Sequence, residues 1–389
     1  MFHSVPSARR IAACLAVIVL SAGIDLVAQE APPEVAIPRL QVGELPDAVA
    51  IDGLLNEAAW TGATVAEGFR QTEPREGEPA TARTTVRVLM GSKAVVIGVV
   101  CEDPDPDRIV SFNVRHDASL NNEDHVRVAL GTFLDGRSGY IFAVNPTGAR
   151  YEALIEPGGD GENADWDGIW DAKAARLPNG WSVEIWIPLH TLSFKPELRE
   201  WHFNVQRRIQ RLLETDRWAS PARQYRISQT SRAGHLVGLP DFSLGLGLSV
   251  RPAVTTGGGI PASGQSADGQ FQPSLDITER LGSGLLAAAT INTDFAETEV
   301  DTRRTNLTRF PLFFPEKREF FLDGATFFDF QSTYGGNNTL LPYFTRRIGL
   351  DTNGNPQKID VGSKLAWQYK TNDIGAMYVR TGEQGGMPG

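Results

Sequence analysis

The feature that most restricts the fold is the stretch from Glu123 to Asp171, where apolar and polar residues alternate in three consecutive runs. The apolar positions are Val126, Val128 and Leu130, then Tyr140, Phe142 and Val144, then Tyr151, Ala153 and Ile155. Turn residues separate the runs, Asp-Gly at 135–136 and Asn-Pro-Thr-Gly at 145–148. Alternation with a period of two between turn signals predicts a meander of antiparallel β-strands.

Composition limits the class of protein and its partners. The chain has 389 residues, of which 41% are hydrophobic and 22% charged, so it can bury a core and form two domains. The formal net charge of -10 argues against a nucleic-acid partner, because phosphate binding needs a clustered cationic surface.

The N-terminus has the pattern of a targeting segment. Arg9 and Arg10 precede an apolar run at 11–20, three small residues follow at 21–23, and the small residue Ala28 before Gln29 would suit cleavage. This order predicts a signal peptide over 1–28 that exports the chain. A membrane anchor is the alternative, but the apolar run is about half of the ~20 residues that a span needs. The Pro-containing stretch 29–40 is predicted to be a linker.

Further alternating runs continue to about residue 239. The runs at 86–90 and 95–101 are separated by Gly-Ser-Lys, which predicts a hairpin, and two more runs begin at Trp181 and Trp201. A short helical turn is expected to carry Trp60 into the core. Together about seven or eight strands with apolar inner faces predict a β-sandwich over 41–239.

Several of these segments, taken in the order in which they occur, resemble segments of a known family. They are IDGLLNEAAW, TTVRVLM, VVIGVVCEDPDPD, NEDHVRVALGTF, GYIFAVNPTG, GWSVEIWIPLHTL and WHFNVQRRI. In this order they resemble the family-nine carbohydrate-binding modules and their relatives. The resemblance covers roughly half of the chain. It implies a β-sandwich that binds sugars, often at the reducing ends of polysaccharides, with structural calcium in some members.

The resemblance also implies where a sugar would lie. The family's stacking tryptophan lies three residues before the aspartate that opens an edge strand, and these positions are Asn121 and Asp124 here. A second family tryptophan maps near Ile227, with Tyr225 close to it in the sequence. Asn121, Asp124 and Tyr225 are therefore the implied carbohydrate-binding positions. The family's glutamate and arginine correspond to Arg127 and Ala143, so the polar contacts differ as well.

Asn121 has no aromatic ring, so other residues would have to supply the stacking surface for a sugar. The candidates are Trp166 and Trp170, which lie among acidic residues in the segment DWDGIWD. We expect sugar stacking on these two rings, and a structural role in the sandwich core is the alternative. On the same loop, Asp160, Glu162 and Asp165 offer the oxygen ligands that Ca²⁺ takes in proteins. A solvated acidic loop is the alternative to a calcium site.

After the sandwich, the pattern changes to longer strands. Runs of about ten residues with one apolar face and one small or polar face suit an outer-membrane barrel with lipid outside. They begin at Leu244, Leu285 and Ile359. We expect 240–389 to be the start of such a barrel, incomplete in this chain, with a Phe-rich segment at 310–330. A second soluble sandwich is the alternative.

A second resemblance concerns the Phe-rich segment. FFPEKREFFLDG followed by FTRRIG resembles a bacterial outer-membrane family of uncharacterised function, in which a family-nine-like module precedes a β-barrel. Some members are labelled membrane-associated hydrolases. The resemblance implies an all-β protein located at the cell outer membrane.

Three functions remain open. The first is carbohydrate binding at the outer membrane for glycan capture and catabolism. The second is hydrolysis of O-glycosyl bonds at the junction of the sandwich and the barrel, and the third is an outer-membrane pore. Catalytic residues stay unknown, since any pair of the 47 acidic residues could be nominated and no nucleophile motif occurs. The six histidines show no metal-ligand spacing.

Overall fold

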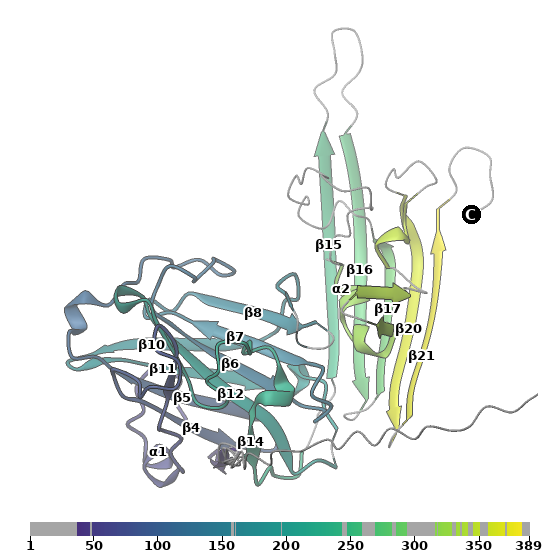
Figure 1. The fold of residues 1–389 in the computed structure, drawn as a ribbon. Helices are drawn as coiled ribbons and strands as arrows, with labels where there is room; N and C mark the ends of the chain where they lie inside the picture. Colours follow the sequence, from purple (N-terminus) through teal and green to yellow (C-terminus); the bar gives the residue numbers. More distant parts are fainter. Residues whose placement is uncertain are drawn as a thin grey trace, which may run out of the picture. The chain divides into compact units, whose positions relative to one another are not determined.

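The computed structural model describes most of the chain beyond the predicted signal peptide (Figure 1). The described residues are 37–46, 49–156, 159, 161–195, 197–242, 247–258, 269–281, 285–293, 316, 318–328, 332–334, 337–340, 345–350, 357–369 and 372–382. The predicted signal peptide, most of the predicted linker, Asp160 and the first part of the Phe-rich segment lie outside these residues.

The larger sheet of the sandwich follows the order β1, β14, β12, β6, β7, β8, β9, and β13 pairs with both β12 and β3. Its strands are β1 (Arg39–Gln41), β3 (Arg70–Glu73), β6 (His125–Gly131), β7 (Gly139–Val144), β8 (Arg150–Ile155), β9 (Glu162–Asn163), β12 (Glu200–Ile209), β13 (Glu214–Arg217) and β14 (Gly234–Val237). The predicted meander is confirmed as β6, β7 and β8, which pair antiparallel in sequence order. The last residues of the predicted linker, from Arg39 onward, form a strand that pairs with β14.

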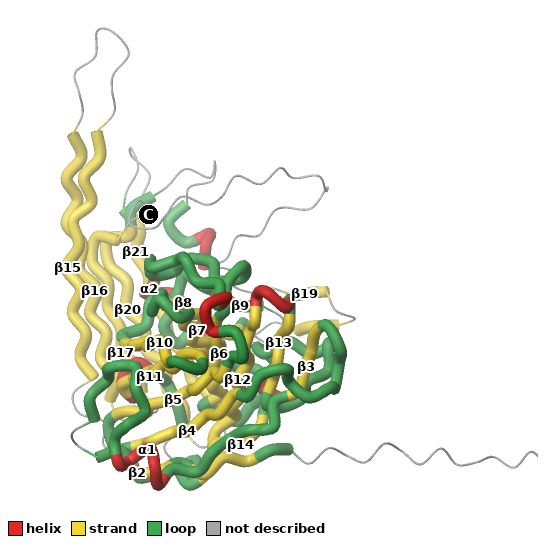
Figure 2. Tube along the Cα trace, turned by 90° about the vertical axis from the view of Figure 1, so that its left-hand side faces the viewer, coloured by secondary structure: helices red, strands yellow, loops and turns green. Residues whose placement is uncertain are grey.

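The second sheet follows the order β10, β11, β5, β4, β2. Its strands are β2 (Gly43–Glu44), β4 (Thr84–Met90), β5 (Ala94–Glu102), β10 (Asp171–Leu177) and β11 (Gly180–Pro188). The predicted hairpin is confirmed, since β4 and β5 pair in register around the short turn that joins them. Helical segments are short: α1 (Ala58–Gly62), η1 (Pro106–Arg108), η3 (Leu189–Thr191), η4 (Gln210–Leu212) and η5 (Thr230–Arg232). In Figure 2 the helices appear as short red pieces among strands and loops.

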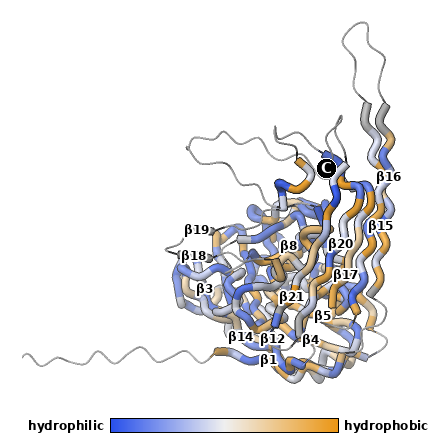
Figure 3. Tube along the Cα trace, turned by 90° about the vertical axis from the view of Figure 1, so that its right-hand side faces the viewer, coloured by the Kyte–Doolittle hydropathy of each residue, from blue (hydrophilic) through white to orange (hydrophobic). Residues whose placement is uncertain are grey.

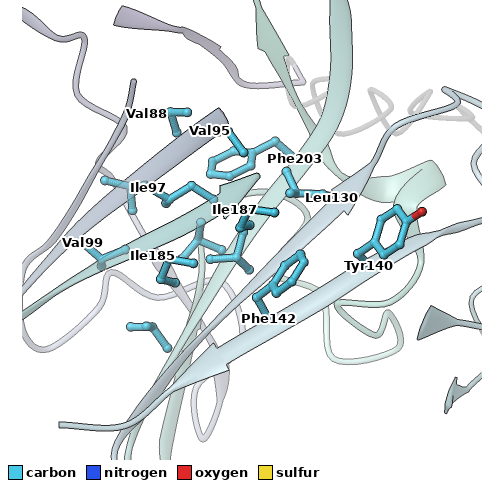
Figure 4. Packing of buried hydrophobic residues seen from close by; sticks show 14 of the residues in the cluster. Val88, Val95, Ile97, Val99, Leu130, Tyr140, Phe142, Ile185, Ile187 and Phe203 are labelled. Carbon is cyan, nitrogen blue, oxygen red and sulfur yellow. The ribbon is translucent and has the colours of Figure 1, made fainter. Parts of the chain in front are cut away.

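One apolar core joins the two sheets and confirms the predicted sandwich. Side chains from β4, β5 and β11 meet side chains from β6, β7 and β12 in a single buried cluster. Figure 4 shows Val88, Ile97 and Ile185 on one side, with Leu130, Phe142 and Phe203 facing them. Burying β-branched and aromatic side chains between the sheets supplies the main stabilisation.

The outer face of the larger sheet is also covered, which alternation alone did not predict. Phe142 in β7 pairs with Glu152 in β8, so Ala153 and Ile155 point away from the main core. They form a second buried cluster with Ala129, Ile141 and Ile227. The segment around Ile227 therefore acts as a lid over this face.

Five C-terminal strands form a separate antiparallel sheet in the order β15, β16, β17, β20, β21. The strands are β15 (Gly247–Gly258), β16 (Gly269–Leu281), β17 (Leu285–Thr293), β20 (Ile359–Tyr369) and β21 (Asn372–Thr381). The remaining elements are α2 (Glu319–Leu322), η7 (Ala325–Phe328), β18 (Ser332–Tyr334), β19 (Asn337–Leu340) and η8 (Thr345–Arg347). The runs predicted from Leu285 and Ile359 are thus confirmed as strands. Among the described residues, no helix is long and apolar enough to cross a membrane.

Hydrophobic and hydrophilic residues alternate along the strands of this C-terminal sheet (Figure 3), so its two faces differ in character. Along β20, residues at odd positions from Val361 to Trp367 are exposed, and those between them are buried. Large exposed apolar side chains recur on the same face of the neighbouring strands: Leu248, Val250, Val254, Phe271, Ile291, Val361, Leu365, Trp367, Ile374 and Tyr378. We call the face with these exposed apolar side chains the apolar face. The opposite face carries Arg251, Asp276 and Lys364.

Candidate functional site

A pocket of about 270 Å³ is lined by residues of the sandwich and of the C-terminal sheet. Its lining residues are Trp166, Asp167, Gly168, Ile169, His190, Thr191, Leu248, Ser249, Arg251, Asp276, Thr278, Arg280, Ala289, Glu319, Phe320 and Asp323. We call it the acidic pocket, because four carboxylates contribute to it beside two guanidinium groups. Concave sites with a few convergent polar groups are the usual form of a ligand-binding site.

The short helix α2 positions the acids of the pocket. Phe320 and Phe321 are buried in an apolar cluster with Ala288 and Ile359, which holds α2 against the polar face of the sheet. The Lys364 ammonium group donates to the backbone carbonyls of Phe320 and Asp323. Consequently, the side chains at both ends of α2 project toward the pocket.

Two ion pairs order the charged groups of the pocket. Arg251 forms an ion pair with Glu319. Arg280 Nη2 lies 2.9 Å from Asp323 Oδ1, and Arg280 Nη1 donates to the backbone carbonyl of His190 at 2.9 Å. This second guanidinium group therefore links the pocket wall in the sandwich to the wall in the sheet.

Burial perturbs the titration of two groups in the pocket. Loss of solvation raises the pKa of Glu319 to about 7, and the nearby Asp323, Asp167 and Asp276 add to the rise while Arg251 opposes it. Burial, together with the charge of Arg280, lowers the pKa of His190. A carboxyl group with a pKa of about 7 can donate a proton near neutral pH.

The two tryptophans of the acidic loop are core residues. Trp166 is 4% exposed and Trp170 is 6% exposed, and both belong to the main core cluster. The Trp170 ring centroid lies 5.1 Å from that of Phe142, and the Trp166 centroid lies 5.1 Å from that of Tyr140. Trp170 is therefore corrected from a stacking residue to a core residue. Trp166 packs in the core and also reaches the wall of the acidic pocket.

The three positions implied by the family resemblance have separate surroundings. Asn121 is exposed in the turn before β6. Asp124 is buried, and its carboxylate accepts backbone hydrogen bonds from Val110 at 2.9 Å and Gln210 at 2.5 Å. Tyr225 is half-buried, with the Arg232 guanidinium group 4.8 Å from its ring centroid. Asp124 therefore ties two loops together, and its oxygens are already occupied by backbone donors.

An internal network occupies the sheet face where the family's polar sugar contacts map. Arg127 forms an ion pair with Glu162, and the Tyr151 hydroxyl donates to Glu162 at 3.2 Å. The Arg127 guanidinium group also lies 5.5 Å from the Tyr151 ring centroid. Ala143 is buried beneath this network. The charged groups on this face are therefore mostly paired with other groups of the protein.

The proposed calcium ligands are only partly described. Asp160 lies outside the described residues, and the Glu162 carboxylate is already neutralised by Arg127. Asp165 is half-buried, and its backbone N–H donates to the Asn163 side chain at 3.1 Å. Calcium at these positions stays a prediction. A different group in the described residues, His116, Asp117 and Glu152, brings three possible ligand atoms within 4.8 Å of one another.

Two sheets packed through one core define a β-sandwich protein, extended by an additional antiparallel sheet. A family described as a domain of unknown function (DUF5916) matches residues 264–374. No curated protein matches this sequence.

Solved structures similar to this chain include a family-nine carbohydrate-binding module from Caldicellulosiruptor kristjanssonii in complex with cellotriose. It is 16% identical, covers 51% of this chain and 93% of its own, and has a TM-score of 0.38. A family-nine module from the same organism in complex with glucose is 17% identical, covers 53% of this chain and 97% of its own, and also has a TM-score of 0.38.

Proposed function

We propose that this protein binds carbohydrate in the acidic pocket. The observation that carries the proposal is the composition of the pocket wall, in which carboxylates, guanidinium groups and hydroxyls surround a space of about 270 Å³ beside aromatic side chains. Carboxylate and guanidinium groups are planar and can make paired hydrogen bonds to neighbouring hydroxyls. The volume lies just below the roughly 300–1,000 Å³ of drug-sized ligand sites, which suits one or two sugar rings.

A titration with matched variants tests this proposal. Cellotriose and glucose are suitable first probes, followed by a wider panel of glycans. Arg251→Ala removes a guanidinium group from the pocket, and we expect it to weaken binding about tenfold or more, because that change requires only about 1.4 kcal/mol. Arg83→Ala is the control, since Arg83 forms an exposed ion pair with Glu67 and does not line the pocket. Equal loss in both variants, or no binding of any glycan by the wild type, would contradict the proposal.

Hydrolysis of a glycosidic bond in the same pocket is a second function that we propose for testing. The observation that favours it is Glu319, whose pKa of about 7 suits a general acid near neutral pH. Glycosidases combine such an acid with a second carboxylate, and Asp276 and Asp323 also line this pocket.

The release of nitrophenol from aryl glycosides measures this activity. We expect Glu319→Gln to abolish turnover while sugar binding persists, and the wild-type rate to fall above pH 7 as Glu319 loses its proton. An active Glu319→Gln variant would exclude this residue as the acid. Binding without turnover in the wild type would leave the binding function alone.

We also propose that the apolar face contacts lipid at the cell outer membrane. Its support is the row of exposed apolar side chains that continues across all five strands in register. The strands have 9 to 13 residues, close to the roughly 9–11 residues of a membrane-crossing strand. Separation of inner and outer membranes after expression tests this location. Recovery in the soluble fraction without detergent would contradict it.

A further inference from the structure

The side chains of the consecutive residues His116 and Asp117 meet that of Glu152, which lies 36 positions after His116 in the sequence. His116 Nε2 lies 2.8 Å from Glu152 Oε2 and 3.6 Å from Asp117 Oδ1. All three ligand atoms fall within 4.8 Å of one another. Ligand atoms about 2.0–2.2 Å from a tetrahedral Zn²⁺ ion lie roughly 3.3–3.6 Å apart, so small side-chain rotations suffice to close the group around such an ion.

Glu152, the buried member of the group, lacks a hydrogen bond to one carboxylate oxygen. The residue is 0% exposed, and its Oε1 atom has no hydrogen-bond partner. The indole N–H of the nearby Trp170 does not reach hydrogen-bond geometry with this oxygen. A buried carboxylate with an unsatisfied oxygen is costly, and a bound cation would remove that cost.

The loop that carries the other two ligands is anchored in place. The backbone N–H of Asp117 donates to the Arg150 carbonyl at 2.9 Å, next to Glu152 on β8. Earlier in the loop, the backbone N–H groups of Phe112 and Asn113 donate to Glu123 Oε2 at 2.7 and 3.1 Å. The approach of His116 to Glu152 therefore follows from the loop path. Its imidazole is partly exposed, which leaves an entry route and open positions for water.

We propose that His116, Asp117 and Glu152 form a binding site for a divalent transition metal, best suited to Zn²⁺. An imidazole nitrogen with two carboxylate oxygens is a donor set that Zn²⁺ accepts, with water completing the coordination. Ca²⁺ is a poorer match, since it prefers six to eight oxygen ligands. The site is separate from the acidic pocket, because none of its three residues lines that pocket.

The alternative for these three residues is a metal-free ion pair, with a protonated imidazole between two carboxylates. Metal binding distinguishes the two arrangements. The full chain, freed of metal by chelation, is titrated with ZnCl2 by calorimetry, and the melting temperature is recorded with Zn²⁺, Ca²⁺ or Mg²⁺. We expect binding of one Zn²⁺ with release of protons, and a rise in melting temperature that Ca²⁺ and Mg²⁺ do not reproduce.

Variants connect that result to the site. We expect His116→Ala to lose more than about tenfold in Zn²⁺ affinity, because removing even an outer-shell partner typically costs about 10–100-fold. Asp241→Asn, at an exposed carboxylate outside both the group and the pocket, should bind Zn²⁺ as the wild type does. Asp117→Asn is a mild second variant, since Asp117 has a φ of 59°, which asparagine also adopts readily. It should weaken binding without loss of the fold.

Co²⁺ supplies a spectroscopic readout that a purely structural role would not change. A tetrahedral Co²⁺ complex absorbs strongly in the visible range, and this absorption should disappear in His116→Ala. No Zn²⁺ binding by the wild type, or equal Zn²⁺ affinity in the wild type and His116→Ala, would overturn the proposal. Either outcome leaves sugar binding in the acidic pocket unaffected.

Discussion

At the scale of single residues, buried charge is the main departure from a simple sandwich core. Arg207 on β12 is fully buried, and its guanidinium group donates to the Glu102 carbonyl at 2.8 Å and to the Thr84 hydroxyl at 3.1 Å. Its cross-strand partner Asp216 is also buried, with no hydrogen-bond partner for either carboxylate oxygen. Burial, and then the adjacent Glu214, raise the pKa of Asp216 to about 8.

Asp216 should make stability depend on pH. In the unfolded chain an aspartate titrates near about 3.9, so between pH 4 and 8 the folded chain binds the proton more tightly. Stability contributed by the protonated group is therefore present at low pH and falls as pH rises through this window. We expect Asp216→Asn to reduce this slope, which denaturant unfolding at pH 5 and pH 8 measures. Asp241→Asn, at an exposed ion pair, is the control. If Asp216→Asn showed the same dependence of unfolding free energy on pH as the wild type, Asp216 would not be the origin of that dependence.

Trp170 offers a second test at this scale. Because its ring is buried against Phe142, we expect Trp170→Ala to lower the free energy of unfolding by about 3–5 kcal/mol. The neighbouring Ile169 is 51% exposed, so Ile169→Ala should change stability much less. Thermal unfolding of both variants decides between a core role and a surface role. A stable Trp170→Ala protein would restore the stacking hypothesis.

At the scale of elements, the outer side of the second sheet depends on α1. The indole N–H of Trp60 donates to Glu184 Oε1 at 3.0 Å, and Glu184 Oε2 accepts the backbone N–H of Gly53 at 2.9 Å. Leu55, before α1, and Trp60 lie over Gly98 of β5, where an added Cβ atom would come within 2.5 Å of Leu55 and 3.0 Å of the indole. A glycine at this position lets α1 and its preceding turn pack directly on the sheet.

Gly98→Val should therefore push α1 away from β5. We expect a loss of about 1–3 kcal/mol in unfolding free energy, as is typical of overpacked sites. Gly62→Ala in α1 is a matched control, because a Cβ atom there would meet nothing within 4 Å. Hydrogen exchange of the Trp60 indole proton should accelerate only in Gly98→Val. Equal exchange rates in Gly98→Val and Gly62→Ala would show that the packing of α1 on Gly98 does not control exchange of the Trp60 indole proton.

At the scale of the whole molecule, the two sheets of the sandwich hold nearly all of the main core. Leu322 of α2 is its sole contribution from beyond residue 242 within the described residues. The C-terminal sheet has its own smaller apolar cluster around Phe320 and Phe321. The sandwich is therefore expected to be stable without the C-terminal sheet, as a domain with its own core.

The boundary of that domain can be tested directly. We expect residues 37–239 to fold cooperatively, because this range includes β1 and its buried Leu40. A chain of 42–239 lacks this strand and should melt at a lower temperature. The predicted boundary at 41 would remove most of β1 as well. Circular dichroism and thermal melting of the two chains provide the measurement. A molten 37–239 chain would mean that the sandwich needs the C-terminal sheet.

The sequence by itself determined most of the long strands and, for most of them, which side chains enter the core. Alternation with a period of two assigned β6, β7, β17 and β20, because side chains on a strand necessarily point to opposite faces. It also specified the inner faces of β4, β5, β6, β7, β11 and β12, whereas the apolar positions predicted for β8 lie in the second cluster on the outer face of the larger sheet. The local sequence was sufficient for these strands, because the alternation of apolar and polar side chains can be recognised within a few residues.

Only the tertiary structure decided what lies beside each functional group. His116 meets Glu152 through a loop path, and Arg280 meets Asp323 through the placement of α2. The role of Trp170 depended likewise on Phe142 of β7. Alternation defines the face of a strand but not its neighbours, since register and loop paths arise from packing of the whole chain. For this reason the strands could be predicted, whereas the acidic pocket and the proposed metal site required the fold.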